Sequence, residues 1–338
     1  MKEAMFFEKL QGTKVRCYLC RHYCIIGNGK KGFCRVRENR DGTLYTLVYR
    51  KLISQNVDPV EKKPFFHFYP GSTSFSLATV GCNFRCLNCQ NYEISQLPGD
   101  YEYIAGKDVA PEKIVEEALN YRCTSIAYTY TEPTIFFEYA YDVARIAYNH
   151  SIKNVFVTNG YITREALATI KPYLNAVNID LKSFSDETYR TLCSARLEQV
   201  IECIRSYKEM GIWIEITTLI IPGINDTASE LREIAAFIKS VGPEIPWHVN
   251  RFYPMYRLIE KPPTPLKTVK MAREIGLKAG LRYVYEGNVP GDEGESTYCY
   301  NCNKMLIKRY GYQMIGNSIT NSKCPACSTN IDGVGISV

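Results

Sequence analysis

Eleven of the fourteen cysteines in this 338-residue chain gather in three short segments, and this clustering limits what the chain can fold into. Four lie between residues 17 and 34, three between 82 and 89, and four between 299 and 327. No apolar leader opens the sequence and no run of about 18 apolar residues follows, so we expect neither export nor a membrane span. In the reducing cytoplasm that we therefore expect, such cysteines indicate metal ligands more than disulfides.

Turn-prone runs near residues 70 and 290 predict three parts: a Cys-rich metal-binding head (1–70), a core (71–290) and a C-terminal tail (291–338). Within the core, β-rich runs alternate with helical patterns. The expected strands are 75–80, 124–130, 153–158, 175–181, 212–220, 246–252 and 282–286. The expected helices are 111–121, 134–149, 163–171, 186–209, 227–240 and 267–278. This alternation predicts an α/β fold with a parallel sheet, either a full or partial (β/α) barrel or an open doubly wound sheet.

Cys82, Cys86 and Cys89 form a C-x3-C-x2-C motif directly after the first expected strand of the core. Three thiolates at this spacing can bind three irons of a [4Fe-4S] cluster and leave the fourth iron open, as a catalytic metal centre requires. Zinc needs four ligands, and the nearest histidine, His67, is distant in the sequence. A disulfide within the motif would leave the third cysteine unpaired. The motif therefore favours a catalytic iron–sulfur cluster at a strand end, where barrels and open sheets carry their reactive groups.

This loop resembles that of the radical S-adenosylmethionine (SAM) superfamily. The resemblance implies that SAM binds the open iron, and that one electron from the cluster breaks its C–S bond to give a 5′-deoxyadenosyl radical. It also implies that Glu132, in a Thr-Glu-Pro run where the superfamily has Gly-Gly-Glu-Pro, meets the methionine ammonium. Other polar residues at strand ends are also expected to contact SAM: Thr158, Asn159, Asp180, Lys182 and Asn250. For Asp180 and Lys182 a purely structural ion pair is the alternative. We assign no catalytic residue.

The head and the tail each carry four more cysteines. Those of the head fit either zinc, which is slightly preferred, or a second iron–sulfur cluster: Cys17, Cys20, Cys24 and Cys34. Those of the tail form two C-x2-C pairs that predict a zinc-ribbon-like or rubredoxin-like site, with zinc preferred: Cys299, Cys302, Cys324 and Cys327. The β-prone segment 305–320 supplies the hairpin between the two pairs.

A wider set of motifs resembles the AmmeMemoRadiSam system radical SAM enzymes, which are related to pyruvate formate-lyase activating enzymes. The set comprises Cys20-Arg-His-Tyr-Cys24, Gly32-Phe-Cys34, Asp58-Pro-Val-Glu-Lys-Lys-Pro-Phe-Phe-His67, Cys89-Gln-Asn91, Tyr130-Thr-Glu-Pro133 and Gly287-Asn-Val-Pro-Gly291. The resemblance implies Memo-type and AMMECR-type protein partners and a reductant protein. Asn88 departs from the aromatic residue that many superfamily members place before the third cysteine, so stacking on the adenine must come from elsewhere.

The function that we expect is reductive cleavage of SAM for hydrogen abstraction from a substrate that the sequence does not name, with a protein as one candidate. A net charge of +6, from 41 basic and 35 acidic residues, together with the tail, motivates an alternative as an RNA-modifying radical enzyme. A metal-braced scaffold or electron carrier is a third alternative. It would need a cluster closed by four protein ligands.

Overall fold

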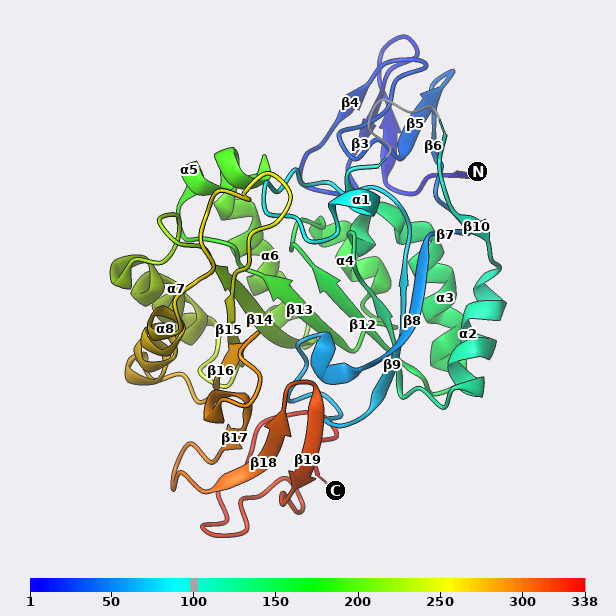
Figure 1. Cartoon of the computed structure of the whole chain (residues 1–338). Coiled ribbons are helices and arrows are strands. Elements are labelled where there is room, and N and C mark those ends of the chain that lie inside the picture. The colour runs from blue at the N-terminus through cyan, green and yellow to red at the C-terminus, as the bar shows by residue number, and fades with distance from the viewer. Residues whose placement is uncertain (98–102, 338) are drawn as a thin grey trace. The chain divides into compact units, whose positions relative to one another are not determined.

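The structure, a computed structural model, describes residues 1–97 and 103–337 (Figure 1). These residues form two compact units, each assembled from segments that are separated in the sequence. Unit 1 comprises Met1–Asp58, Thr73–Val177 and Leu192–Ile212, and unit 2 comprises Pro59–Ser72, Asn178–Thr191 and Trp213–Val338. The expected boundaries near 70 and 290 do not coincide with these units, so the three-part division stays a sequence-based prediction.

The core of unit 1 is a sheet in the order β8-β9-β11-β12-β13. The parallel register pairs Ser125 of β11 with Ser74 of β9 and with Lys153 of β12. The middle strands are almost wholly buried, as in a sheet covered by helices on both faces. Their bounds are β8 (Ser54–Pro59), β9 (Thr73–Ala78), β11 (Ser125–Tyr128), β12 (Lys153–Thr158) and β13 (Ala176–Asp180). The helices are α2 (Pro111–Asn120), η2 (Pro133–Phe136), α3 (Phe137–Asn149), α4 (Arg164–Ile170) and α6 (Leu197–Glu209).

Short strands build the head part of unit 1. One sheet has the order β1-β6-β5 and another the order β2-β3-β4. A buried ion pair joins the head to α3, since Arg37 Nη2 lies 2.7 Å from Glu138 Oε1. The bounds are β1 (Lys2–Glu3), β2 (Phe7–Lys9), β3 (Val15–Cys17), β4 (Ile25–Ile26), β5 (Arg37–Arg40), β6 (Thr43–Thr46), β7 (Lys51–Leu52), α1 (Tyr92–Ser95) and β10 (Lys107–Asp108).

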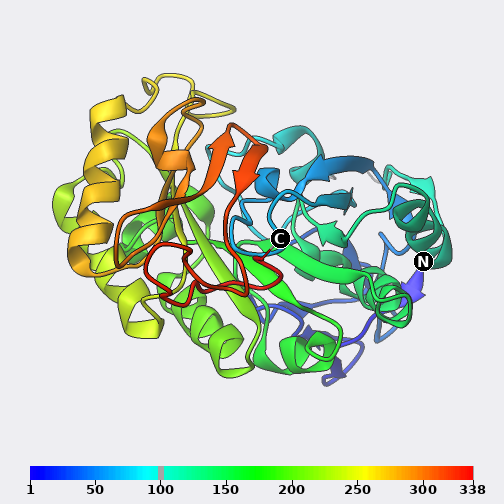
Figure 2. The same cartoon turned by 90° about the horizontal axis from the view of Figure 1, so that it is seen from below.

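In unit 2 the sheet order is β13-β14-β15-β16, and the tail adds a three-stranded sheet β17-β18-β19. Figures 1 and 2 show α7 and α8 side by side, and α8 packs on β15 and β16. The bounds are η1 (Val60–Lys62), α5 (Asp186–Thr188), η3 (Tyr189–Cys193), β14 (Trp213–Ile220), α7 (Ala228–Val241), β15 (Trp247–Arg251), α8 (Leu266–Ala279), β16 (Val284–Gly287), η4 (Glu293–Glu295), β17 (Thr297–Tyr298), β18 (Met305–Tyr310) and β19 (Gln313–Asn317). All seven expected core strands and the tail hairpin are confirmed.

The helix expected over 186–209 is wrong, because the chain forms α5, a π-helical turn and α6 with a break at residues 194–196. Ser194 has a φ of 57°, which a continuous right-handed helix does not allow. The break lets two carbonyl groups accept hydrogen bonds from the loop that carries the central cysteines. Leu192 O accepts from Leu87 N at 3.0 Å, and Cys193 O accepts from Arg85 N at 2.9 Å. Across the described residues no helix is long and apolar enough to cross a membrane.

A buried polar network ties the segment before β9 to β14, β15 and β16 within unit 2. Glu215 Oε2 lies 2.7 Å from His248 Nε2, and Glu215 accepts hydrogen bonds from the backbone N–H groups of Phe66 and His67 at 2.9 and 2.8 Å. His67 Nε2 lies 2.5 Å from the hydroxyl of Tyr285. Satisfied buried groups of this kind fix one arrangement, because breaking any member leaves a polar atom without a partner. His248 is therefore a structural residue here.

We expect unit 2 to lose stability as the pH falls from about 6.5 to 4. Burial lowers the pKa of His67 to about 4, whereas the unfolded chain has the ordinary value of about 6.5. Below pH 6.5 the unfolded state therefore binds a proton that the folded state does not bind. By pH 4 the resulting loss in the free energy of unfolding approaches roughly 3 kcal/mol. Denaturant unfolding of the wild type and His67→Gln between pH 7 and 4 measures it. The free energy of unfolding of His67→Gln should fall less steeply with decreasing pH than that of the wild type. The exposed control His150→Gln should follow the wild type. Equal slopes for His67→Gln and the wild type would contradict the assignment to His67.

Candidate active site

The loop with Cys82, Cys86 and Cys89 follows β9, as expected. Gly81 introduces it with a φ of 96°, and a Cβ there would lie 2.7 Å from Val36 Cγ1, so the turn requires glycine. Cys82 is buried, while Cys86 and Cys89 are partly exposed. All fourteen cysteines belong to the described residues, and none is in a disulfide. The three thiols are thus available as ligands on a loop that is held at both ends.

Hydrogen-bonding groups lie beside the sulfur atoms of Cys82 and Cys89 in this loop. The backbone N–H of Phe84 donates to Cys82 Sγ at 3.3 Å, and Asn159 Nδ2 lies 3.9 Å from the same sulfur. Cys89 Sγ lies 3.0 Å from Ser95 Oγ. Burial raises the pKa of the Cys82 thiol well above its ordinary value, and Glu132 raises it further. A buried thiolate here therefore needs a cation, and N–H donors to sulfur are the contacts that tune iron–sulfur clusters.

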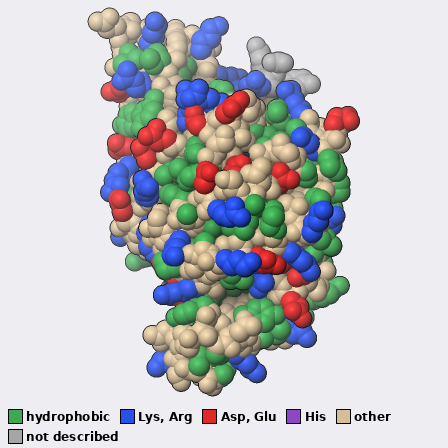
Figure 3. Space-filling model, turned by 90° about the vertical axis from the view of Figure 1, so that its left-hand side faces the viewer, with side chains coloured by type: hydrophobic (Ala, Val, Ile, Leu, Met, Phe, Trp, Pro, Cys, Tyr) green, Lys and Arg blue, Asp and Glu red, His purple; other side chains and the backbone are tan. Residues whose placement is uncertain are grey.

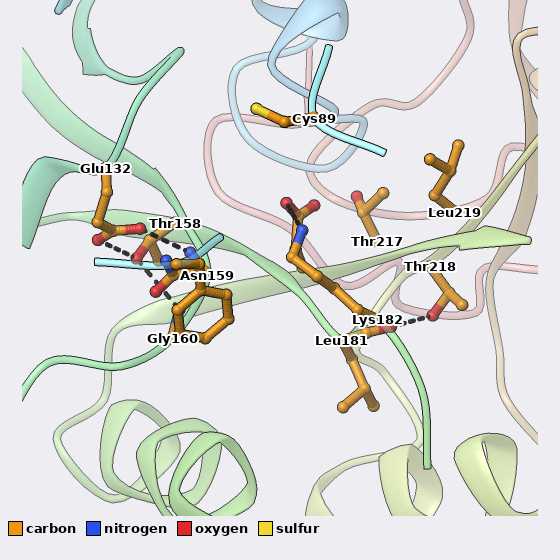
Figure 4. A network of polar contacts seen from close by, with 12 residues as sticks. Cys89, Glu132, Thr158, Asn159, Gly160, Leu181, Lys182, Thr217, Thr218 and Leu219 are labelled. Atoms are coloured by element: carbon orange, nitrogen blue, oxygen red, sulfur yellow. Dashed lines mark hydrogen bonds and ion pairs between the residues drawn. The ribbon is translucent and has the colours of Figure 1, made fainter. Parts of the chain in front are cut away.

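Glu132 is fully buried at the end of the second core strand, and both of its oxygens are hydrogen bonded (Figure 4). Oε1 accepts from Thr134 N, Thr134 Oγ1 and Thr158 Oγ1 at 3.0, 2.6 and 2.7 Å. Oε2 accepts from Asn159 N at 2.9 Å. Burial raises the pKa of Glu132, and the hydrogen bonds from Asn159 and Thr134 oppose that rise. Within the described residues Oε2 carries fewer bonds than Oε1, so it is the oxygen better able to accept from a ligand cation.

Three buried amide atoms around this site have no hydrogen-bond partner within the described part of the chain. They are Asn83 Nδ2, Asn88 Oδ1 and Asn159 Oδ1. The remaining amide atoms of Asn83 and Asn159 do meet, with Asn159 Nδ2 donating to Asn83 Oδ1 at 2.7 Å. An unsatisfied buried polar atom costs about 1–3 kcal/mol, so this cluster of donors and acceptors fits a polar ligand beside the cysteine loop.

Tyr130 occupies the first of the two positions where the superfamily has glycine, and it adopts a φ of 65°. This left-handed conformation is costly for a bulky residue, which explains why glycine is the usual choice. Its hydroxyl donates to Asp58 Oδ2 at 2.6 Å, and Asp58 comes from the distant motif that ends at His67. Both residues belong to motifs named in the sequence analysis, but the sequence did not predict their contact, because nothing local in it pairs positions 58 and 130.

Asp180, Lys182 and Asn250 lie in unit 2. Lys182 Nζ lies 2.8 Å from Asp180 Oδ2, so the two charges pair, and both side chains remain partly exposed. Thr218 Oγ1, on β14, donates to the carbonyl oxygen of Leu181, which directly follows β13, at 2.9 Å (Figure 4). Asn250 on β15 packs against the backbone of Gly287, where a Cβ would lie 1.9 Å from its Oδ1. The contacts that these three residues were expected to make with SAM stay predictions.

The tail cysteines gather as expected. Cys299 Sγ lies 3.6 Å from Cys327 Sγ, and Cys302 Sγ lies 3.6 Å from Cys324 Sγ. All four sulfur atoms lie within 4.8 Å of one another. Four thiolates in this arrangement suit one tetrahedral metal ion.

The head cysteines line a cavity of unit 1. Cys17 and Cys34 are buried, and Cys20 and Cys24 are partly exposed. The same cavity is lined by apolar side chains that include Leu19, Ile26, Phe33 and Ile135. Burial raises the pKa of the Cys34 thiol to about 11 and that of Cys20 well above its ordinary value. As in the central loop, the thiolate form therefore requires a metal.

Basic and acidic side chains are interspersed on the face shown in Figure 3. A nucleic-acid site is usually a basic stripe or patch, so this face offers no support for RNA as a partner.

A sheet of parallel βαβ units with a three-cysteine loop after its first core strand defines the class of radical SAM proteins, and comparison with known proteins agrees. The model of the radical SAM superfamily matches residues 76–238, and the chain belongs to this superfamily.

Three further similarities extend the comparison. The uncharacterized protein MJ0808 of Methanocaldococcus jannaschii is 48% identical over 98% of this chain and 99% of its own length. The pyruvate formate-lyase-activating enzyme of Clostridium pasteurianum is 20% identical over 48% of this chain and 67% of its own length. The crystal structure of Streptococcus suis SuiB bound to S-adenosylmethionine is 15% identical, covers 62% of this chain and 49% of its own, and has a TM-score of 0.50. That last likeness concerns the fold alone.

Membership of this superfamily implies a [4Fe-4S] cluster and SAM. Three thiolates on one loop, N–H donors to sulfur and orphaned amide atoms beside them fit both groups. When bound, cluster and SAM together supply a 5′-deoxyadenosyl radical. Asn83 and Ser95, which contact Asn159 and Cys89, were missed by the sequence reasoning. Asn83 directly follows the first cysteine, so its position in the loop was the signal that could have found it.

Proposed function

We propose that this enzyme cleaves SAM reductively and uses the radical to abstract hydrogen from a protein, as a relative of the glycyl-radical activating enzymes. The observation that carries SAM binding at this loop is the group of unpartnered buried amide atoms beside Cys82 and Glu132. The similarity to a pyruvate formate-lyase-activating enzyme favours a protein substrate.

In this proposal the residues of the chain bind and orient the cluster and SAM. Cys82, Cys86 and Cys89 hold the cluster. Glu132 Oε2 accepts from the methionine ammonium, while Thr158 and Asn159 hold that carboxylate in place through the hydrogen bonds described above. Contacts of Asp180, Lys182 and Asn250 with SAM are also part of this proposal, on the superfamily resemblance alone.

Deuterium transfer tests the substrate class. The reconstituted enzyme, SAM and a low-potential reductant are incubated anaerobically with protein or RNA fractions from fully deuterated cells, and the 5′-deoxyadenosine is examined by mass spectrometry. We expect deuterium in the product with the protein fraction and none with RNA. Deuterium from RNA alone would replace the proposal by RNA modification, and 5′-deoxyadenosine absent in every arm from a fully loaded enzyme would refute SAM cleavage itself.

Glu132→Gln should weaken SAM binding about 30-fold. The change keeps the shape and removes the charge, and loss of one partner of a buried charge pair costs at least about 2 kcal/mol. Equilibrium dialysis with the reconstituted enzyme measures it. Glu138→Gln is the matched control, because Glu138 is equally buried but pairs with Arg37. Its SAM affinity should stay at the wild-type value, and equal affinity in Glu132→Gln would contradict the assigned contact.

We also propose zinc in the tail and protein partners of the Memo and AMMECR types. The close packing of the four tail sulfurs supports the metal. The partners rest on the wider motif set, which resembles that of the AmmeMemoRadiSam system enzymes. Affinity purification of the tagged chain from its own cells, followed by mass spectrometry, should recover both partners. Failure to recover either partner would contradict the proposal of these partners.

A further inference from the structure

The head cavity and the central cysteine loop are neighbours within unit 1. A Cβ at Gly81, the residue before Cys82, would lie 3.2 Å from the carbonyl oxygen of Cys34. His22, between the second and third head cysteines, has its Nε2 2.6 Å from the carbonyl oxygen of Asn83. The backbone of one cysteine group therefore packs directly on the backbone of the other.

Arg85 connects the two groups through hydrogen bonds. Its Nη1 donates to the carbonyl oxygen of Cys82 at 2.8 Å, and its Nη2 donates to the carbonyl oxygen of Phe33. The guanidinium also lies over the Phe33 ring, 4.6 Å from its centroid. The backbone N–H of Phe33 in turn donates to Cys24 Sγ at 3.5 Å. A continuous path thus runs from a head sulfur through Phe33 and Arg85 to the backbone of the first loop cysteine.

The spacing of the sulfurs separates the head from the tail. Zinc holds its four sulfurs about 3.8 Å apart, because each Zn–S bond is about 2.3 Å long and the geometry is tetrahedral. The tail sulfurs match this spacing with contacts of 3.6 Å. Among the described residues neither the head cysteines nor the central three form a group within 4.8 Å, although the four head residues line one cavity. Wider spacing suits a cubane, in which each sulfur binds a different iron.

We propose that Cys17, Cys20, Cys24 and Cys34 hold a second [4Fe-4S] cluster, which passes single electrons to the central loop. Four thiolates complete its coordination, so it offers no open iron to SAM. A one-electron reductant protein would reduce it from the 2+ to the 1+ state and would itself lose one electron. The head cluster would return to 2+ as the central cluster goes from 2+ to 1+, and no atom or proton moves. The electron transfer to the central cluster rests on the proposed function, whereas the binding of a cluster by the head cysteines does not.

The head site is tested with the triple variant Cys82→Ala, Cys86→Ala and Cys89→Ala, which leaves the head intact. After anaerobic reconstitution we expect about eight irons per wild-type chain and about four in the variant. The electron paramagnetic resonance spectrum of the reduced variant should not change when SAM is added. A variant without iron but with zinc beyond that of the tail would overturn the proposal. Cys123→Ala, outside all three groups, controls for loss of a buried cysteine.

The relay is tested with Cys20→Ser and Cys24→Ser combined, in enzyme whose central cluster is shown to be loaded. With a flavodoxin-type donor, 5′-deoxyadenosine formation should fall at least tenfold, whereas with titanium(III) citrate it should match the wild type. Equal rates with the flavodoxin-type donor, or equal losses with both reductants, would overturn the relay. A wild type that forms no product with titanium(III) would instead refute the proposed function, and the iron count of the triple variant would still decide the head site.

Discussion

Cys86→Ala should reduce 5′-deoxyadenosine formation by more than about 1000-fold, which corresponds to about 4 kcal/mol or more in activation free energy. Cys86 is the middle ligand of a loop that supplies three thiolates, and two thiolates leave a second iron exposed to water and oxidants. The loop has a fixed backbone, since Leu87 N and Arg85 N donate to the carbonyl groups of Leu192 and Cys193 at 3.0 and 2.9 Å. A neighbouring residue cannot easily take over the vacant position.

The measurement is product formation under anaerobic conditions, with iron determined in the same sample. Cys123→Ala is the matched control, because it removes a buried thiol from unit 1 but not from the loop. It should retain iron and activity. A Cys86→Ala enzyme that forms product at the wild-type rate would show that the cluster is not held by this loop.

Much of the core could be predicted from the sequence. Most positions in the strands of the central sheet are apolar or β-branched, and short runs of this kind between turn residues indicate strands that are buried on both faces. The central cysteine loop could also be predicted, because its three expected ligands lie close together in the sequence. Glu132 was found through its motif, and the structure places it within hydrogen-bonding distance of Thr158 and of the Asn159 backbone.

The features that were missed depend on contacts between distant segments. Residues 186–209 have a helical period, but the helix breaks where the carbonyl groups of Leu192 and Cys193 bind the cysteine loop instead. Periodicity reports the preference of one segment and not the tertiary hydrogen bonds that override it. The pair of Tyr130 and Asp58 was missed for the same reason. Tyr130 compensates for a strained backbone with a hydrogen bond across 72 positions of sequence.

Loss of the tail metal should be the largest change in stability. Cys302→Ser removes one ligand from four sulfurs that lie within 4.8 Å of one another, and thiolates that close repel one another without a cation between them. Structural zinc contributes roughly 10–16 kcal/mol to the folding of small zinc peptides. The tail also has an apolar core that includes Leu306, Ile307 and Ile331, so part of its fold survives and the expected loss is on the order of 5 kcal/mol.

Limited proteolysis and metal analysis measure this loss. Cys302→Ser should contain no tail zinc and should be cleaved between residues 299 and 330 far faster than the wild type, whereas Cys123→Ser should resemble the wild type. Treatment of the wild type with a zinc chelator should reproduce the cleavage, and added zinc should reverse it. Because the central loop lies in unit 1 and the tail in unit 2, the iron of the central cluster should survive the substitution. A tail that resists protease without metal would mean that its apolar core alone holds the hairpin, and that the four cysteines serve another purpose.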